Sequence, residues 1–285
     1  MSRCQIIGAS IMVSVLCASC TTVTEPEHMA HVEQATTTSA PPSARSVRAE
    51  SALGKELRRV VDGAVAHHGG RAGLAVVSEG QVYSAGDPAQ GAAWSTIKVP
   101  IAIAAYRAGT AEDDTARAAI TYSDNDASVE LWNSLGKSAE ASAAVQEVLS
   151  LTGDPTDVAR QWGHSGARVS FGEVSWPLSG QALFASKVQC VEGAEPVVEL
   201  MGEISEEHKY GLGLFPGAVF KGGWGPDDDG VFTMRQLGVV DGVGIAMYVH
   251  PEDETESEGR AMLDDMARGL RELLAKGDIR ASRGC

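Results

Sequence analysis

The chain has 285 residues, of which 44% are hydrophobic and 21% charged, so it can form a folded domain with a sizeable core. Its formal net charge is −15 and no cluster of Lys or Arg stands out, which argues against a nucleic-acid partner. We interpret the acidity as a solvated surface.

The N-terminus is predicted to be a targeting segment. Arg3 supplies a positive start and residues 6–16 form an apolar stretch that is too short to span a bilayer, which is typical of a cleaved signal peptide. Residues 16–20 resemble a lipoprotein signal box in which Cys20 is the lipidated first mature residue. Cys17 departs from the Leu, Val or Ile that is usual at its position. Plain secretion with cleavage nearby is the alternative.

Three regions follow from composition. Residues 1–19 are the expected signal peptide, and residues 20–46, rich in Thr, Ser, Pro and Ala without periodicity, are the expected flexible tether. Residues 47–285 carry regular hydrophobic patterns and are expected to form one domain. Of the five cysteines, Cys190 and Cys285 remain in this domain. In an oxidising compartment they either pair or remain as one buried and one loose thiol.

The first part of the domain is predicted to contain a helix, two strands and then several helices. We predict a helix from about 47 that Gly69-Gly70 ends, then strands at 72–77 and 81–84 separated by a Glu-Gly turn. An apolar helix at 95–108, ended by Gly109, and helices at 115–121, 127–135 and 139–151 follow. The segment 152–175 is expected to be irregular, and a helix is expected from Pro177 to about 188.

The last third is strand-rich. Residues 218–224, 232–240 and 243–249 are predicted strands, and the second and third are joined by an Asp-Gly turn. The final helix has an apolar stripe and stops at Gly277. Strands at both ends of the domain predict an antiparallel sheet built from both termini, and the helices between them predict a second lobe. The expected fold class is therefore α/β in the broad sense (α+β).

Three short segments carry candidate chemistry: Ser-Thr-Ile-Lys at 95–98, Ser-Asp-Asn at 123–125 and Lys-Gly-Gly at 221–223. Residues three apart on a helix share a face, so Ser95 and Lys98 are expected to be neighbours near a helix N-terminus. A serine hydroxyl needs a base to become a nucleophile, and lysine is a base only where burial or a nearby cation disfavours its charge. Lys221 is a candidate for that cation. Residues 134–137 repeat the Ser-x-x-Lys pattern, but at a predicted helix C-terminus beside glycine, so we reject them.

Each of the other two segments has a structural alternative. Ser, Asp and Asn are all preferred helix N-caps, so residues 123–125 also fit a capping motif between two helices. Glycine within a strand marks either a bulge or the close approach of a ligand or another backbone, and both remain open for Gly222 and Gly223.

Taken together and in this order, the three segments resemble the motifs of the serine β-lactamase and penicillin-binding protein superfamily, most closely its class A β-lactamase-like branch, over residues 47–285. The resemblance implies that Ser95 is the acylated nucleophile, that Lys98 takes its proton and that Ser123 relays a proton to the leaving nitrogen. It also implies substrate-binding roles: Asn125 orients the substrate amide, Lys221 attracts a carboxylate, Gly223 completes the third motif, and the N–H groups of Ser95 and Trp224 form an oxyanion hole.

This sequence departs from the family pattern. The Glu-x-x-Leu-Asn segment that holds the deacylating water is absent: residues 160–164 read Arg-Gln-Trp-Gly-His, and Glu173, the nearest acid that follows them, has the wrong spacing. Acylation followed by slow hydrolysis is therefore expected. The usual Lys-Thr/Ser-Gly is Lys-Gly-Gly here, so one hydroxyl donor to a substrate carboxylate is lost. The short gap between Lys98 and Ser123 implies a trimmed helical lobe.

The resulting hypothesis is a serine hydrolase that acts on β-lactams or D-Ala-D-Ala-type peptidoglycan amides, anchored by lipid on the outer side of the cytoplasmic membrane. No cofactor or metal is expected, because the seven histidines show no metal-ligand spacing. A penicillin-binding protein or pseudo-enzyme that recognises cell-wall peptide with little turnover is one alternative. An envelope interaction protein that keeps only the fold is another.

Overall fold

A computed structural model describes residues 51–164, 171–226, 230–282 and 284–285. The expected signal peptide, the tether and Cys20 lie outside these described residues, so those expectations stay predictions.

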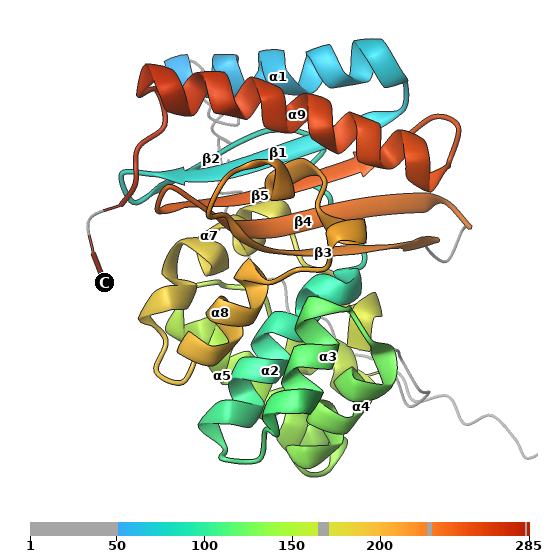
Figure 1. The fold of residues 1–285 in the computed structure, drawn as a ribbon, viewed down its shortest axis with the longest axis vertical. Helices are drawn as coiled ribbons and strands as arrows, with labels where there is room; N and C mark the ends of the chain where they lie inside the picture. Colours follow the sequence, from blue (N-terminus) through green and yellow to red (C-terminus); the bar gives the residue numbers. More distant parts are fainter. Residues whose placement is uncertain (1–50, 165–170, 227–229, 283) are drawn as a thin grey trace, which may run out of the picture. The chain divides into compact units, whose positions relative to one another are not determined.

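The centre of the domain is an antiparallel sheet whose strands come from both ends of the domain (Figure 1). Its order is β2-β1-β5-β4-β3. The strands are β1 (Arg71–Ser78), β2 (Gln81–Gly86), β3 (Val219–Pro226), β4 (Phe232–Val240) and β5 (Val243–His250). Asp241 and Gly242 turn β4 into β5 with φ values of 50° and 77°, as a tight hairpin turn requires. The predicted sheet is confirmed, and its edge strand β3 carries the Lys-Gly-Gly segment.

Helices cover both faces of this sheet (Figure 1). The first and last helices, α1 (Ala52–His68) and α9 (Glu256–Lys276), pack side by side over one face. α7 (Leu178–Lys187) packs on the other face against β5, β1 and β4. Gly277 ends α9 in the left-handed conformation, with φ of 74°, which confirms the predicted stop.

A helical lobe lies between the two groups of strands in the sequence. Its helices are α2 (Lys98–Arg107), α3 (Asp113–Thr121), α4 (Asn125–Ser134), α5 (Ser138–Leu151), α6 (Val158–His164) and α8 (Glu195–Gly202). The expectation of an irregular segment over 152–175 was wrong where α6 lies, and α8 was not predicted. Both helices are short, and helices of that length are stabilised by tertiary packing more than by their own sequence.

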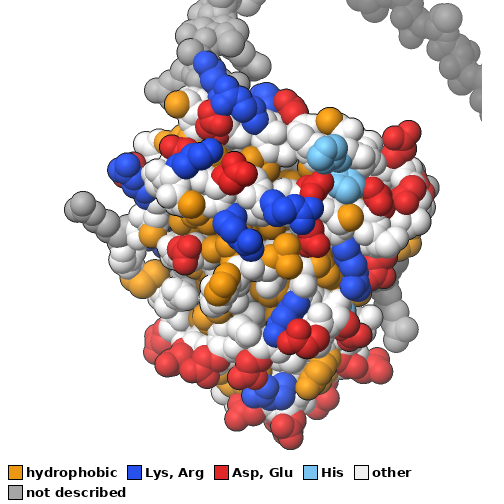
Figure 2. Space-filling view, turned by 45° about the horizontal axis from the view of Figure 1, so that its top comes forward, with side chains coloured by type: hydrophobic (Ala, Val, Ile, Leu, Met, Phe, Trp, Pro, Cys, Tyr) orange, Lys and Arg blue, Asp and Glu red, His pale blue; other side chains and the backbone are white. Residues whose placement is uncertain are grey.

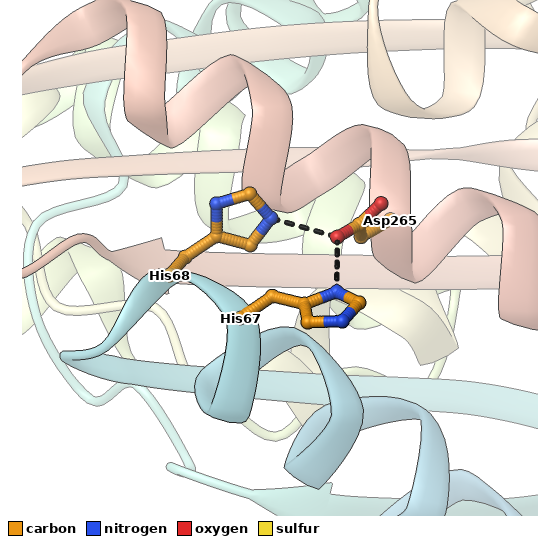
Figure 3. Close-up of side chains that lie close together, drawn as sticks. All are labelled: His67, His68 and Asp265. Atoms are coloured by element: carbon orange, nitrogen blue, oxygen red, sulfur yellow. Dashed lines mark hydrogen bonds and ion pairs between the residues drawn. The ribbon is translucent and has the colours of Figure 1, made fainter.

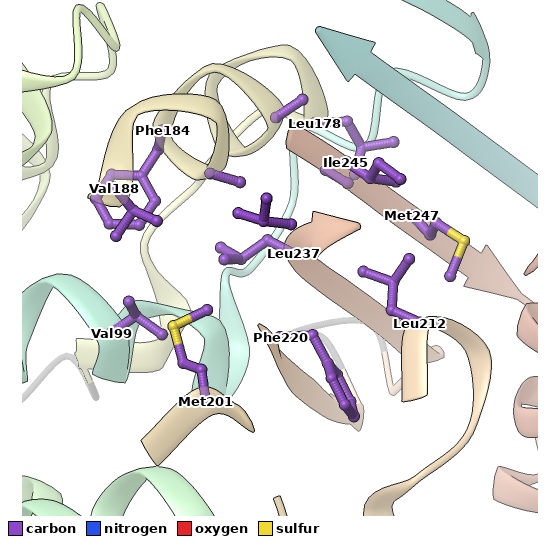
Figure 4. Packing of buried hydrophobic residues seen from close by; sticks show 14 of the residues in the cluster. Val99, Leu178, Phe184, Val188, Met201, Leu212, Phe220, Leu237, Ile245 and Met247 are labelled. Carbon is purple, nitrogen blue, oxygen red and sulfur yellow. The ribbon is translucent and has the colours of Figure 1, made fainter. Parts of the chain in front are cut away.

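One hydrophobic core joins sheet and lobe (Figure 4). Phe184 from α7, Val99 from α2, Met201 from α8 and Leu237 from β4 are all fully buried in it. Because α2 begins at Lys98, three residues after Ser95, this packing fixes the position of the candidate nucleophile relative to the sheet.

The surface is acidic over the helical lobe. Figure 2 shows acidic side chains gathered at the foot of the view, and α3, α4 and the residue before α3 expose Glu112, Asp113, Asp114, Asp126 and Glu130. Such a surface repels polyanions. No helix among the described residues is long and apolar enough to cross a membrane.

The two cysteines of the domain form a disulfide, Cys190–Cys285, across 95 positions of sequence. The open choice between pairing and free thiols is thus decided in favour of pairing. The same C-terminal segment is held by a hydrogen bond from the Gly80 backbone N to Ser282 Oγ.

Removing this disulfide should destabilise the domain. Because it closes a long loop, we expect Cys190→Ser to lower the free energy of unfolding by about 2–5 kcal/mol. Chemical denaturation of the oxidised protein, the reduced protein and the variant measures this. Equal midpoints for all three would show that the tail is held without the bond.

Candidate active site

Ser95 lies in a single 3₁₀ turn, Trp94–Ile97, directly before α2. The expected helix over 95–108 thus begins as this tighter turn, and α2 proper starts at Lys98. Trp94 is held at a φ of 50°, a strained conformation for a bulky residue. Its indole Nε1 donates to Thr233 Oγ1 on β4 over 2.9 Å, which ties the turn to the sheet. The chain therefore presents Ser95, which is partly exposed, at a sharp corner.

The Lys98 ammonium is buried beside the Ser-Asp-Asn segment. The residue is 1% exposed, and its Nζ lies 2.5 Å from Ser123 O, 2.7 Å from Asn125 Oδ1 and 3.2 Å from Asp124 O. Burial lowers the pKa of Lys98 to about 8, against a smaller opposing effect of the Asp124 charge. At pH 7 about a tenth of the molecules then carry neutral Lys98, the form able to accept a proton.

Ser123 connects Lys98 to the second lysine. Its Oγ accepts a 2.8 Å hydrogen bond from Lys221 Nζ and lies 3.4 Å from Lys98 Nζ. Ammonium groups only donate, so the Ser123 hydroxyl proton stays available for a third group. Ser123 has φ of 60°, which directs the segment between α3 and α4 towards both lysines.

Lys221 is 2% exposed and projects from the edge strand. Burial first, and the charge of Lys98 second, hold its pKa well below the ordinary value. Among the described residues, no carboxylate forms an ion pair with either lysine. Two adjacent buried amines without an anion make the site a strong attractor for a negatively charged ligand.

The capping alternative for residues 123–125 is partly correct. Asp124 is the N-cap of α4 and its Oδ1 accepts from the Ala127 backbone N over 2.7 Å. Ser123 and Asn125, on either side of Asp124, instead turn to Lys98. Asn125 is exposed, so a ligand can reach its side chain.

Gly223 marks a close approach and not a bulge, because the register of β3 with β4 runs without a bulge from Val219 to Pro226. A Cβ atom on Gly223 would lie 2.6 Å from the backbone N of Ser95, so any side chain there is excluded. The backbones of the edge strand and of the Ser95 turn are thus in contact. This contact places the backbone N of Ser95 close to Trp224, the residue that follows Gly223. Gly222 has room: a Cβ there would meet Tyr210 Oη at 3.5 Å.

Two residues at this edge escaped the sequence analysis. The rings of His208 and Trp224 are 5.0 Å apart, and burial first, then the charge of Lys221, lowers the pKa of His208. Tyr210 is 5% exposed, and burial raises the pKa of its hydroxyl, which keeps it protonated. Both lie in the segment between α8 and β3, where no local pattern marks them as functional.

The region expected to hold a deacylating carboxylate is built differently. Gln161, on α6, holds this segment: its Oε1 accepts from the Ser175 N over 2.6 Å and its Nε2 donates to the Ser175 O over 3.0 Å. Glu173 follows in a short 3₁₀ turn and is exposed. The neighbouring Gly172 packs against Trp94, since a Cβ there would lie 3.4 Å from the Trp94 O. Residues 165–170 lie outside the described residues, and their sequence contains no Asp or Glu.

The fold has known counterparts. The TLA-3 extended-spectrum β-lactamase aligns with a TM-score of 0.60 at 13% identity over 77% of this chain and 98% of its own. A β-lactamase from Chitinophaga pinensis aligns with a TM-score of 0.59 at 17% identity over 76% of this chain and 99% of its own. A class A β-lactamase from Mycobacterium abscessus gives 0.57 at 17% identity over 77% and 99%.

No family model matches the chain, and no curated protein matches it by sequence. The similarity is therefore one of fold. The resemblance drawn from the three motifs is confirmed at that level: this chain has the fold of the serine β-lactamases.

The titration of Lys98 is directly measurable. We expect its side-chain resonances to titrate with a midpoint near pH 8 in heteronuclear NMR, against about 10.4 for a free lysine. Because the folded pKa is the lower one, the unfolded chain binds more protons between these values, so this group makes folding more favourable as pH rises through that window. A midpoint above 10 would contradict the burial argument, and a Lys98→Arg sample identifies the resonance by its loss.

Proposed function

We propose that this protein is a serine acyl-transfer enzyme that forms an ester between Ser95 and the carbonyl of a β-lactam or of a D-Ala-D-Ala-type peptidoglycan amide. The observation that carries the proposal is the array of two buried lysines, Lys98 and Lys221, on either side of Ser123 Oγ. Ser95 adjoins this array through the turn that precedes Lys98 and through the close approach of Gly223. The fold of the serine β-lactamases supports it.

The proposed chemistry balances within this array. Ser95 Oγ attacks the carbonyl carbon, and its proton passes to neutral Lys98. The oxyanion that forms accepts hydrogen bonds from the N–H groups of Ser95 and Trp224. The carbon–nitrogen bond then breaks, and the leaving nitrogen takes the proton of the Ser123 hydroxyl. Ser123 in turn regains a proton from Lys98, which returns to its neutral form. Lys221 binds the substrate carboxylate, and Asn125 orients the substrate amide.

In this structure Ser95 Oγ forms no hydrogen bond with any described residue. Lys98 faces Ser123 and Asn125 instead. Catalytic contacts are often loose without substrate and tighten in the complex. The proposal therefore includes a short movement of Lys98 Nζ towards Ser95 on binding.

Covalent labelling tests the nucleophile. After exposure to a penicillin, intact-protein mass spectrometry should show one adduct, located on Ser95 by peptide mapping and absent from Ser95→Ala. Ser134→Ala is the matched control, because Ser134 begins the second Ser-x-x-Lys pattern, at the end of α4, and it should label as the unchanged protein does. An adduct that persists in Ser95→Ala refutes the assignment. No adduct on any variant favours a protein that keeps only the fold.

Turnover is proposed to be slow. An acyl-enzyme ester needs an activated water, and a positioned general base typically contributes about 10²–10⁴-fold to the rate. Asp157 and Glu173, the acids that flank residues 160–164 in the sequence, are both exposed. The exposure of both acids supports a penicillin-binding protein with little turnover as the second candidate function.

Stopped-flow measurements with a chromogenic cephalosporin should therefore show a burst of about one equivalent followed by slow steady hydrolysis. A linear trace with a kcat on the order of 10–10³ s⁻¹ would mean that an unidentified residue activates the water.

We also propose that the domain is tethered to the outer side of the cytoplasmic membrane through lipid on Cys20. The signal-box pattern supports this. Cys20→Ser should move the protein from the membrane fraction to the soluble fraction, with Cys17→Ser as the control that stays membrane-bound. Unchanged fractionation of Cys20→Ser would contradict lipid anchoring, and release of the unsubstituted protein would indicate plain secretion.

A further inference from the structure

On the face of the sheet that α1 and α9 cover, these two helices bring two histidines and a carboxylate together (Figure 3). His67 Nδ1 and His68 Nε2 lie 3.2 Å and 2.7 Å from the same oxygen, Asp265 Oδ2. All three donor atoms lie within 4.8 Å of one another. Sequence spacing did not indicate this group, because Asp265 lies 197 positions beyond His68.

The surroundings prepare these donors for a metal ion. His68 is 13% exposed, and its other nitrogen, Nδ1, is hydrogen-bonded to Glu258. A carboxylate on the far nitrogen fixes the ring and leaves Nε2 for a metal, as in many zinc sites. The second Asp265 oxygen pairs with Arg268. Because neither of these contacts uses Nε2 or Oδ2, an ion can replace the hydrogen bonds between them.

We propose that His67, His68 and Asp265 bind Zn²⁺ and thereby clamp the end of α1 to α9. Zinc accepts two imidazoles and one carboxylate, and tetrahedral ligands at usual zinc distances are roughly 3.3 Å apart. The 3.2 Å between His67 Nδ1 and Asp265 Oδ2 already matches this separation, and the 2.7 Å between His68 Nε2 and Asp265 Oδ2 widens when the ion replaces the hydrogen bond. His67 is 77% exposed, so its ring can turn to bring the third pair of donor atoms, His67 Nδ1 and His68 Nε2, to the same separation. A groove of about 470 Å³ between α1 and α9, lined by His67 and Asp265 among others, admits the ion and leaves the fourth position to water.

Metal binding by the full chain tests this site. In calorimetry after chelator treatment, Zn²⁺ should bind with one equivalent that His67→Ala and Asp265→Asn both lose. Zn²⁺ at a hundredfold excess over its Kd should raise the Tm by roughly 5–10 °C, and Mg²⁺ should not. Co²⁺ should give the visible absorption of a tetrahedral site.

His250→Gln is the matched control, since His250 also faces a carboxylate, Glu254 at 3.8 Å, but without a third converging donor. It should keep the full equivalent. His67→Ala changes an exposed side chain, so its folding is not at risk. Equal zinc binding by all variants, or no zinc binding by the unchanged protein, overturns the proposal and leaves the group as an ion-pair cluster.

A second, independent observation concerns Tyr210, beside the edge strand. Its hydroxyl forms no hydrogen bond with any described residue although the residue is almost entirely buried. The hydroxyl faces Gly222, where a Cβ would lie 3.5 Å from it. Arg260 of α9 stacks on the Tyr210 ring at 4.8 Å and fixes it. A rigid, protonated donor without a protein partner among the described residues thus lies next to Gly222, the residue that follows Lys221.

Resting on the proposed function, we infer that the Tyr210 hydroxyl donates to the substrate carboxylate that Lys221 attracts. It thereby supplies the donor that Lys-Gly-Gly lacks. Tyr210 is a substrate-positioning residue for anionic substrates, since a hydrogen bond to a charged group contributes appreciably to binding.

Tyr210→Phe tests this role. We expect the second-order rate of Ser95 acylation by a penicillin to fall about tenfold to a hundredfold, through weaker binding. The rate with the methyl ester of the same penicillin should not change. Gly222→Ser in the Tyr210→Phe protein should restore part of the rate, and Gly222→Ala, which adds the Cβ without a hydroxyl, should not.

The outcomes distinguish a failure of the proposed function from a failure of the role given to Tyr210. No acylation of the unchanged protein refutes the proposed function. If the unchanged protein is acylated and Tyr210→Phe reacts at the same rate, the role of Tyr210 is refuted while the proposed function stands. The same holds if Tyr210→Phe loses as much rate with the methyl ester as with the free penicillin. A thermal unfolding curve of Tyr210→Phe that matches the unchanged protein shows that the fold is intact.

Discussion

The arrangement of the candidate site depends on one unfavourable interaction: two lysine ammonium groups buried beside each other without a carboxylate partner among the described residues. Lys98 is 1% and Lys221 2% exposed, and Ser123 Oγ lies between them. Taking a cation out of water costs several kcal/mol unless it is paired. Hydrogen bonds to carbonyl and hydroxyl acceptors offset part of this cost, and the lowered pKa values of both lysines reduce the charge that is buried. The same conditions favour a neutral base and an incoming anion.

Such an arrangement persists only if the surrounding structure holds it in place. The shared core supplies that rigidity, because α2, which starts at Lys98, packs its fully buried face into the same cluster as α7 and the sheet. The Gly223 contact with the Ser95 backbone fixes the edge strand against the 3₁₀ turn. Strain at Trp94 and Ser123, both with positive φ, is tolerated for the same reason. Strain and lysine burial therefore occur together, at the junction of sheet and lobe.

Most regular elements were predictable because their patterns are long. The strand at 232–240 and the stop of α9 at Gly277 were predicted where they lie, since hydrophobic periodicity and glycine conformations act locally. α6 and α8 were missed because seven or eight residues carry too little periodicity. The turn at Ser95 differs from the expected helix because contacts with β3 and β4 tighten it.

The sequence by itself determined the order of the three motifs and the antiparallel sheet from both ends of the domain, because residue types and hydrophobic periodicity act locally. The candidate set Ser95, Lys98, Ser123 and Lys221 came from the resemblance of the three motifs to a known family. Only the tertiary structure decided that Cys190 meets Cys285, that Gly223 marks a close approach, that Tyr210 faces Gly222, and that His67 and His68 meet Asp265. Each of these joins elements far apart in the chain, and the distance between such residues is set by how helices and strands pack, which no local pattern encodes.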